Sequence, residues 1–544
     1  YSLRGMAAQA EERVQMSVRG GERRRWSGAT GLSSLLMAAF VAVMALAAAQ
    51  PAAAQNTQDS SGCSVERLQR MIAPSARVLS AVWKSAAGGV PAHCAVTGYI
   101  QHDGKLGFAL GLPETWNHKF LFIGTGAFAG APGDLTPGLR RGYATASTDT
   151  GHADRDSMNA SWAIGDLAAV RNHFETSIAL VPPAMKQVAA IYYGAAPAYA
   201  YWDGCSGGGR QGLMTAQRYP DMFDGIIAGA PAWNYTKLFI GFIEHTKLIT
   251  RSPDNWIPAE IFHAIDREVL RQCDPLDGVV DGLVDDPRVC HPNLSALRCK
   301  PKAAAASCLT DAQLAVLEEI QHPRFATPGS GYYGYLLSGA DAPQLGWSRF
   351  IFGDHPEAGQ PGKPVVSPAA RLGVGFLRDM IKQDHNYDWR AFSAKADGPA
   401  LERAWGSLTN ADSTDLSRYV RGGGKVIIWH GWADPAIPAQ MSIDLYSRIQ
   451  RDTKGPLVPP TDESVRLFMA PGFQHCRGGT GFTEFDRLTA LEDWVEQGRA
   501  PASISATQLV NGQPRRTRPL CAYPKTARYT GRGSQDDAAN FVCR

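Results

Sequence analysis

Residues 201–212, with the sequence YWDGCSGGGRQG, place a serine inside a glycine-rich turn. The aromatic run before it, 198-AYAYWDG-204, predicts a β-strand, and 210-RQGLMTAQRYP-220 predicts a helix ended by a proline. The five residues from Gly204 to Gly208 match G-x-S-x-G, whose glycines allow the close backbone approach of a strained strand-to-helix turn. This setting predicts an α/β fold with Ser206 as a nucleophile.

Two later segments supply the partners that a nucleophilic serine requires. The apolar run 425-KVIIWHG-431 predicts a strand followed by a loop with Asp434, and 465-VRLFMA-470 predicts a strand followed by a loop with His475. In α/β-hydrolases the acid and the histidine follow the serine in this order, and open α/β sheets gather their ligands at the C-terminal ends of strands. Taken singly, Asp434 is equally typical of a turn and His475 of a surface loop. Together they predict a catalytic triad of Ser206, His475 and Asp434.

The segment 119-KFLFIGTGAFAG-130 predicts an apolar strand that runs into a glycine-rich loop. In this type of fold, one backbone N–H group that binds the oxyanion belongs to the residue after the nucleophile, and the second belongs to a loop after an early strand. We therefore expect Gly207 to be the first donor and Gly126 or Ala127 to be the second. Glycine-rich strand ends often serve only as turns, which is the alternative for this loop.

The ten cysteines form an even set, and all of them follow residue 60. In an exported chain such a set favours disulfides over free thiols or zinc ligands. Spacing alone does not fix the connectivity. Short separations favour the pairs Cys63–Cys94, Cys273–Cys290, Cys299–Cys308 and Cys521–Cys543, which leave Cys205 with Cys476. The last pair would join the serine turn to the histidine loop, and the alternative is two buried thiols that never meet.

The first 55 residues have the pattern of an export signal. A basic run, 23-RRR-25, precedes the apolar 31-GLSSLLMAAFVAVMALAAA-49 and the small residues 51-PAAAQ-55. We predict a signal peptide over residues 1–55 and a secreted or periplasmic protein. The apolar run is also long enough for a membrane anchor, which is the alternative. Once the signal is removed, no stable membrane association is expected.

The charge balance argues against nucleic acid as a partner. The chain has 54 basic and 51 acidic residues, and removing the six arginines and three glutamates of residues 1–55 leaves 48 of each. A chain with no net charge has no general electrostatic attraction for nucleic acids or anionic membranes. We expect a small-molecule partner instead, and the sequence does not indicate an oligomeric state.

The paired motifs Cys205-Ser206 and His475-Cys476, together with Asp434, resemble those of the tannase and feruloyl esterase family, which includes a mono(2-hydroxyethyl) terephthalate hydrolase. The resemblance extends from about residue 60 to the end of the chain. It implies an α/β-hydrolase fold with a large inserted lid domain. We accordingly expect core residues 56–232, a lid over residues 233–419 and core residues 420–544.

The loop 273-CDPLDGVVDGLVDDPRVC-290 concentrates carboxylates in a turn-rich segment between two cysteines. Oxygen ligands suit a hard cation such as calcium, although the spacing is not that of an EF-hand and a run of Asp-Gly turns is the alternative. The family resemblance implies a structural calcium ion. Its implied ligands are the carboxylates of Asp274, Asp277 and Asp281 and the carbonyl groups of Val279 and Leu283.

The resemblance implies a serine esterase that hydrolyses carboxylic esters of aromatic acids without an organic cofactor. The acyl group stays open among hydroxycinnamates, gallate and terephthalate monoesters. Three aromatic residues of the predicted lid, Trp347, Phe350 and Phe376, are candidates either for contacting the acyl group or for packing. A serine peptidase and a non-catalytic binding protein on the same scaffold are the alternative functions.

Overall fold

The structure, a computed structural model, describes residues 60–301, 308–322, 332–339, 345–353 and 367–544. The signal peptide predicted over residues 1–55 lies outside these ranges. Residues Gln55–Arg544 form one compact unit, so the predicted divisions at residues 232 and 419 stay predictions. Among the helices of the described ranges, none has both the length and the apolar character needed to cross a membrane.

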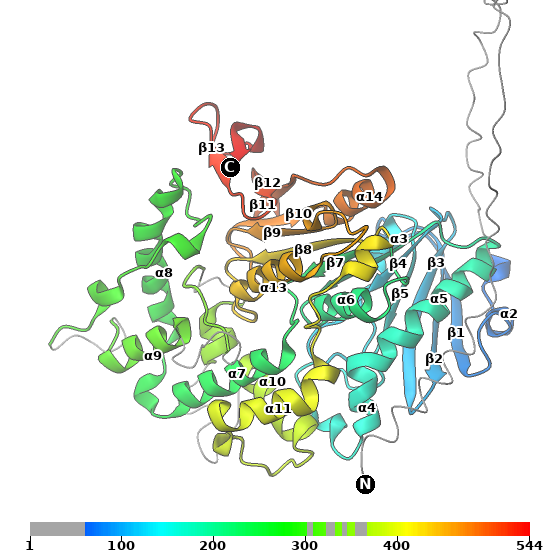
Figure 1. Ribbon diagram of the computed structural model, residues 1–544, viewed down its shortest axis with the longest axis horizontal. Helices are drawn as coiled ribbons and strands as arrows, with labels where there is room; N and C mark the ends of the chain where they lie inside the picture. Colours follow the sequence, from blue (N-terminus) through cyan, green and yellow to red (C-terminus); the bar gives the residue numbers. More distant parts are fainter. Residues whose placement is uncertain (1–59, 302–307, 323–331, 340–344, 354–366) are drawn as a thin grey trace, which may run out of the picture. The chain divides into compact units, whose positions relative to one another are not determined.

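A nine-stranded sheet forms the centre of the described chain, in the order β1-β2-β3-β5-β4-β6-β7-β8-β9 (Figure 1). The pairings among β1, β2, β3 and β5 are antiparallel, and all pairings from β5 to β9 are parallel. The strands are β1 (Ala76–Lys84), β2 (His93–Gln101), β3 (Lys105–Pro113), β4 (Lys119–Ile123), β5 (Ala144–Thr148), β6 (Tyr199–Cys205), β7 (Gly225–Gly229), β8 (Lys425–Gly431) and β9 (Val465–Ala470). The parallel strands point their C-terminal ends to one edge, where β6, β8 and β9 bring the predicted triad residues.

Side chains of successive strand residues point to opposite faces, so the parallel strands fill two cores. Val426 and Ile428 of β8 belong to the larger core, which includes α5 (Ser177–Tyr193), α6 (Gly207–Arg218) and α13 (Ala439–Asp452). Ile427 belongs to a second core on the other face, with Leu491 and Trp494 of α14 (Arg487–Gln497). Burial on both faces explains why most of β8 is an apolar run in the sequence.

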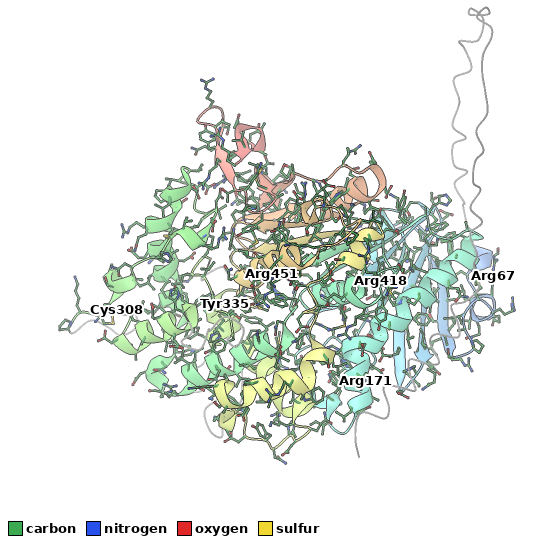
Figure 2. All side chains as sticks on the ribbon, in the orientation of Figure 1. Arg67, Arg171, Cys308, Tyr335, Arg418 and Arg451 are labelled. Carbon is green, nitrogen blue, oxygen red and sulfur yellow. A yellow bond between two sulfur atoms is a disulfide. The ribbon has the colours of Figure 1, made fainter. Side chains whose placement is uncertain are left out.

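The residues between β7 and β8, here called the insertion, contribute no strand to the sheet within the described ranges. The first five of its described α-helices are grouped beside the sheet in Figure 1. These are α7 (Tyr235–Thr250), α8 (Ala259–Cys273), α9 (Asp311–Gln321), α10 (Pro368–Gly375) and α11 (Ala394–Thr409). The last helix, α12 (Ser417–Arg421), contacts α6 and leads into β8. Tyr335 of the insertion, labelled in Figure 2, donates its hydroxyl hydrogen to the carbonyl oxygen of Ala436 at 3.0 Å. The insertion therefore contacts the loop that follows β8.

The C-terminal residues add two small antiparallel sheets. One contains β10 (Phe482–Phe485), β11 (Ser503–Val510) and β12 (Gln513–Cys521), and the other contains β13 (Ala527–Tyr529) and β14 (Phe541–Cys543). The remaining short helices include α2 (Val65–Gln69), α3 (Thr136–Arg140) and α4 (Leu167–Arg171).

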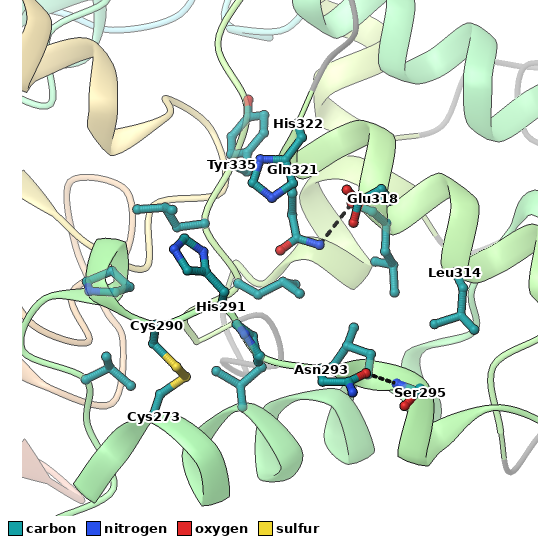
Figure 3. A pocket seen from close by; sticks show the side chains of 18 of the residues that line it. Cys273, Cys290, His291, Asn293, Ser295, Leu314, Glu318, Gln321, His322 and Tyr335 are labelled. Atoms are coloured by element: carbon teal, nitrogen blue, oxygen red, sulfur yellow. Dashed lines mark hydrogen bonds between the residues drawn. A yellow bond between two sulfur atoms is a disulfide. The ribbon is translucent and has the colours of Figure 1, made fainter. Parts of the chain in front are cut away.

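Five disulfides link the same five pairs that the spacing predicted. Four of them close short segments of 9 to 31 residues, as the sequence suggested. The Cys273–Cys290 disulfide lies beside a cavity of about 500 Å³ within the insertion, which His291 and His322 also line (Figure 3). None of the predicted triad residues lines this cavity, so it is separate from the candidate active site.

Candidate active site

Ser206 occupies the turn between β6 and α6 with φ 63° and ψ −123°, a conformation that non-glycine residues adopt only under constraint. The turn is held by its backbone. The N–H group of Ser206 donates to the carbonyl oxygen of Gly229 at 2.9 Å, and the carbonyl oxygen of Ser206 accepts from the N–H groups of Arg210 and Ala232 at 3.0 and 3.2 Å. The helix begins at Gly207 and not at residue 210 as the sequence suggested, because the turn leads directly into it.

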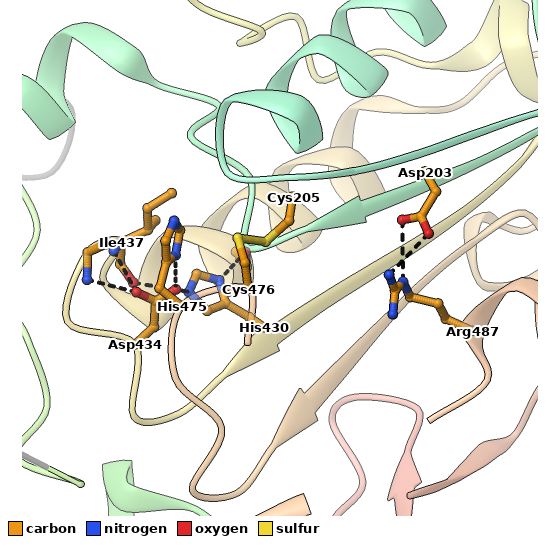
Figure 4. Close-up of a disulfide and its surroundings, with 10 residues drawn as sticks. Asp203, Cys205, His430, Asp434, Ile437, His475, Cys476 and Arg487 are labelled. Atoms are coloured by element: carbon orange, nitrogen blue, oxygen red, sulfur yellow. Dashed lines mark hydrogen bonds and ion pairs between the residues drawn. A yellow bond between two sulfur atoms is a disulfide. The ribbon is translucent and has the colours of Figure 1, made fainter. Parts of the chain in front are cut away.

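Asp434 lies in the loop after β8 and is almost fully buried, with 4% of its surface exposed. Its Oδ1 atom accepts hydrogen bonds from the N–H groups of Ala436 and Ile437 at 2.8 and 2.9 Å. Its Oδ2 atom lies 2.7 Å from Nδ1 of His475, which comes from the loop after β9 (Figure 4). The carboxylate therefore fixes the orientation of the His475 ring and leaves Nε2 available for a proton transfer.

A second histidine, His430 in β8, contacts the same carboxylate and was not identified from the sequence. Its Nε2 atom lies 3.2 Å from Asp434 Oδ2 and 3.0 Å from the carbonyl oxygen of Ile437, and its Nδ1 atom lies 2.7 Å from Ser442 Oγ (Figure 4). Because both neighbours of Nε2 are acceptors, this nitrogen carries a proton and donates. The only sequence signal was a histidine within an otherwise apolar strand.

The ionised form of Asp434 is stabilised despite its burial. Removal from water alone would raise the pKa of this carboxyl, but the charge interaction with His475 and the hydrogen bonds from His430 and His475 lower it below its usual value. The lowered pKa means that Asp434 stays a carboxylate at neutral pH. An ionised partner is what a histidine needs when it becomes an imidazolium during acyl transfer.

The disulfide between Cys205 and Cys476 joins the residue before Ser206 to the residue after His475, across 271 positions of sequence, with Cα atoms 5.8 Å apart (Figure 4). Cys476 has a φ of 61°, and the N–H group of Arg477 donates to the carbonyl oxygen of His475 at 2.7 Å. This is a γ-turn of the rarer, strained kind. The crosslink therefore holds two sharp turns against each other, with the serine on one and the histidine on the other.

Ser206 and His475 line the same cavity, although no hydrogen bond joins them among the described residues. Such contacts are often longer in a substrate-free enzyme than during the reaction. The cavity has a volume of about 500 Å³ and includes all of the predicted oxyanion donors. The structure thus brings together every residue predicted for the chemistry, with Asp434 buried behind His475.

The predicted oxyanion donors lie on two backbone segments in close contact. A Cβ atom built on Gly207 would lie 3.4 Å from the Ala127 nitrogen, and one built on Gly208 would lie 2.8 Å from the carbonyl carbon of Gly124. The N–H group of Thr125 donates to Oε1 of the buried Gln211 at 3.1 Å, which ties the loop to α6. Glycines at positions 207 and 208 permit this approach, which brings the segment of Gly126 and Ala127 against the start of α6. Both candidates for the second donor lie at this contact, since the Cβ atom built on Gly207 would also lie 3.2 Å from the Gly126 Cα atom.

The walls of the cavity are mainly apolar and come largely from the insertion. They include Leu238, Phe239 and Phe242 of α7, together with Leu345, Phe350, Leu372, Met158 and Ile437. Of the three aromatic residues considered from the sequence, Phe350 lines the cavity. Phe376 packs against Tyr235 and Phe239, and Trp347 packs against Tyr335, so these two support other residues and do not line it.

The residues predicted to bind calcium lie in one loop closed by the Cys273–Cys290 disulfide. The carboxylate of Asp274 accepts hydrogen bonds from the N–H groups of Asp281 and Gly282. The carboxylate of Asp277 accepts hydrogen bonds from those of Val279 and Asp285.

Asp281 forms ion pairs with Arg518 and Arg516, at 2.7 and 3.2 Å. Within the described ranges, no three histidine, cysteine, aspartate or glutamate side chains are arranged as a metal site. The side chains of Val279 and Leu283 are buried.

A family model described as tannase and feruloyl esterase matches residues 94–544. This chain belongs to the tannase and feruloyl esterase family. Three relatives are similar over most of their length. An uncharacterized esterase of Xanthomonas campestris is 34% identical over 84% of each chain. The mono(2-hydroxyethyl) terephthalate hydrolase of Piscinibacter sakaiensis is 32% identical over 85% of this chain and 87% of the relative. A probable feruloyl esterase of Aspergillus terreus is 30% identical over 79% and 82%.

Two solved structures confirm the predicted α/β-hydrolase fold. An esterase from Aspergillus oryzae has a TM-score of 0.78 and 26% identity, covering 89% of this chain and 99% of the other. The tannin acyl hydrolase from Aspergillus niger has a TM-score of 0.71 and 22% identity, covering 89% and 95%. The predicted enzyme class is also confirmed, since the family and its named members are esterases. The protein is a carboxylic ester hydrolase.

Removal of the crosslink tests its role in positioning. We expect the double variant Cys205→Ala/Cys476→Ala to lose up to about 4–5 kcal/mol in the free energy of unfolding, because the disulfide closes a long loop and so constrains the unfolded chain. It should also lose about 10²-fold or more in kcat, because small displacements of reacting groups are costly. Thermal denaturation and ester hydrolysis measure the two effects. The matched control, Cys299→Ala/Cys308→Ala, removes a disulfide between cysteines nine positions apart and should keep its kcat. Full kcat in the first variant would contradict the positioning role.

Replacement of His430 tests whether it positions Asp434. We expect His430→Leu to lower kcat about tenfold with little change in KM, because one hydrogen bond to a buried carboxylate is lost. Ser442→Ala keeps the His430 ring but removes a hydrogen bond that orients it. Its kcat should therefore also fall, but by less than that of His430→Leu. Steady-state kinetics on methyl ferulate, with melting temperatures as a check on folding, provide the measurement. Unchanged kcat in both variants would show that His430 only packs the core.

Proposed function

We propose that this enzyme hydrolyses esters of aromatic acids by a two-step acyl transfer. Ser206 attacks the ester carbonyl while His475 takes its proton, and Asp434 stabilises the imidazolium that forms. The N–H group of Gly207 and that of Gly126 or Ala127 hold the oxyanion. The alcohol leaves with the proton from His475, and water then attacks the acyl-enzyme to release the acid. The observation that carries this proposal is the 2.7 Å distance between Nδ1 of His475 and Oδ2 of the buried Asp434. The loop of His475 is crosslinked to the serine turn by the Cys205–Cys476 disulfide.

The lining of the cavity supports a hydroxycinnamoyl group as the acyl part. Phe239, Phe242 and Phe350 provide flat apolar surface for an aromatic ring and its unsaturated linker. These three side chains offer no partner to the three hydroxyl groups of gallate or to the second carboxylate of a terephthalate monoester, which would have to reach the polar lining residues Ser157, Tyr235 and Arg477. The names of the relatives, a probable feruloyl esterase and a terephthalate monoester hydrolase, agree with an aromatic acyl group.

Secretion or export to the periplasm is part of the proposal. Five disulfides form within the described residues, and such bonds persist in oxidising compartments. The Cys205–Cys476 disulfide adjoins both Ser206 and His475. Activity would therefore depend on an oxidising compartment.

We also propose that calcium stabilises the loop of residues 273–290. Carboxylate and carbonyl oxygens suit this cation. Burial raises the pKa of Asp277, and the nearby carboxylates of Asp281 and Asp274 raise it further. Three carboxylates therefore lie close together in this loop, although Asp281 also pairs with Arg516 and Arg518. Their oxygen atoms are of the kind that calcium prefers. The ion would act on stability, since none of these residues lines the catalytic cavity.

Replacement of the nucleophile tests the mechanism. Ser206→Ala should lower kcat by at least about 10⁴-fold with an unchanged melting temperature, because the acyl-enzyme can no longer form. Methyl ferulate, methyl gallate and mono(2-hydroxyethyl) terephthalate are compared as substrates, and methyl ferulate should have the highest kcat/KM. Substantial turnover by the variant would remove Ser206 from its role. Faster hydrolysis of a peptide than of any ester would favour the peptidase alternative, and failure of a fluorophosphonate to label Ser206 would favour a binding protein.

Calcium removal tests the second proposal. We expect a chelator to lower the melting temperature by a few degrees and added calcium to restore it, because a ligand that binds only the folded state stabilises it. Asp277→Asn should abolish the response. Asp286→Asn is a matched control, since this carboxylate lies in the same loop but pairs with Arg288. A melting temperature that does not respond to calcium would refute the proposal.

A further inference from the structure

The catalytic cavity has one arginine among its described lining residues. Arg477 follows Cys476 in the histidine loop and is exposed to solvent. No described aspartate, glutamate or lysine lines the cavity with it. Within the described ranges, the guanidinium of Arg477 has no hydrogen bond or ion pair. A positive charge that has no partner among the described residues is thus available in the lining of a mainly apolar cavity.

The reaction itself determines which half of an ester lies near Arg477. The leaving alcohol oxygen must accept its proton from His475, so the alcohol half lies on the histidine side of the cavity. Arg477 is two residues from His475. The γ-turn at Cys476 keeps these two residues close, since the N–H group of Arg477 donates to the carbonyl oxygen of His475 at 2.7 Å. The oxyanion donors and the apolar walls belong to other segments. Arg477 is therefore on the side of the alcohol and not of the acyl group.

We propose that Arg477 binds a carboxylate carried by the alcohol half of the substrate, so that the preferred substrates are aromatic-acid esters of hydroxy acids. This inference rests on the esterase function proposed above. A guanidinium presents paired N–H donors that match the two oxygens of a carboxylate. With no acidic side chain lining the described part of the cavity, the substrate's own carboxylate supplies the missing negative charge.

The chemistry of such a substrate is that of any ester in the proposed mechanism. Ser206 Oγ forms a bond to the acyl carbon, the bond from that carbon to the alcohol oxygen breaks, and the hydroxy acid leaves with the proton from His475. Water then gives a proton to His475 as it adds to the acyl carbon, the bond from that carbon to Ser206 Oγ breaks, Ser206 regains its proton from His475, and the aromatic acid is released. Arg477 takes no part in these steps, because it binds a distant group. It is a specificity-determining residue.

Two matched esters test this assignment. Chlorogenate is the caffeoyl ester of quinate, and its methyl ester has the same caffeoyl bond and ring hydroxyls but no free carboxylate. We expect the unaltered enzyme to release caffeate from chlorogenate with a kcat/KM about three- to tenfold higher than from the methyl ester, as for a partly exposed ion pair. In Arg477→Gln this ratio should fall to about one, and Arg477→Lys should retain part of it. Raising the salt concentration to about 0.5 M should lower the ratio in the unaltered enzyme.

The controls separate this inference from the function on which it rests. Arg171→Gln removes an exposed arginine that does not line the cavity, and it should keep the unaltered ratio (Figure 2). Methyl caffeate, which is neutral, tests the esterase function alone in the unaltered enzyme. If no ester is hydrolysed, the proposed function fails.

If methyl caffeate is hydrolysed but the ratio is already one in the unaltered enzyme, or persists in Arg477→Gln, the role of Arg477 is refuted. A loss in Arg477→Gln that is confined to mono(2-hydroxyethyl) terephthalate would place the arginine on the acyl side and would also refute it.

Discussion

The covalent bond between Cys205 and Cys476 is the constraint on which the catalytic geometry depends. Ser206 and Cys476 both have a positive φ, of 63° and 61°, which costs about 1–3 kcal/mol for each residue. Neighbouring structure must compensate for this strain. The carbonyl oxygen of Gly229 holds the serine turn, the disulfide joins the two turns, and Asp434 holds the ring of His475. Rigid strands on both sides carry these turns, so the reacting groups are placed before substrate arrives.

The order of the strands explains why one carboxylate serves several partners. Because β6, β7, β8 and β9 are adjacent and parallel, the loops after β6, β8 and β9 meet at one edge of the sheet. Asp434 thereby receives two backbone N–H groups and two histidine rings. A buried carboxylate with four partners remains charged, whereas the same group without them would take up a proton. The network thus supports both the fold at this edge and the proposed chemistry.

The sequence predicted the parts of the fold whose signal is local. Strands β4, β8 and β9 are apolar runs, and the glycines around Ser206 indicate the nucleophile turn. Apart from the triad and the Cys205–Cys476 pair, it did not predict contacts between residues that are far apart. His430 was not identified because its partner Ser442 lies on the following helix, and the pairing of Asp281 with Arg518 spans 237 positions. Nor did the sequence predict how closely α6 approaches the loop after β4, which carries Gly126 and Ala127. The walls of the cavity come from helices of the insertion whose packing no local pattern specifies.

The insertion leaves the sheet after β7 and returns at β8, and these two strands are paired neighbours, with Gly225 opposite Lys425 and Gly229 opposite Trp429. Because the two strands are parallel, the insertion leaves the sheet at the C-terminal end of β7 and re-enters it at the N-terminal end of β8, and the pairing of the strands fixes both points. Helices of another length or composition can be accommodated between them without altering the register of the sheet or the turn that carries the serine. This architecture makes the acyl pocket a replaceable module, so that related enzymes can diverge in substrate while one catalytic frame is inherited intact.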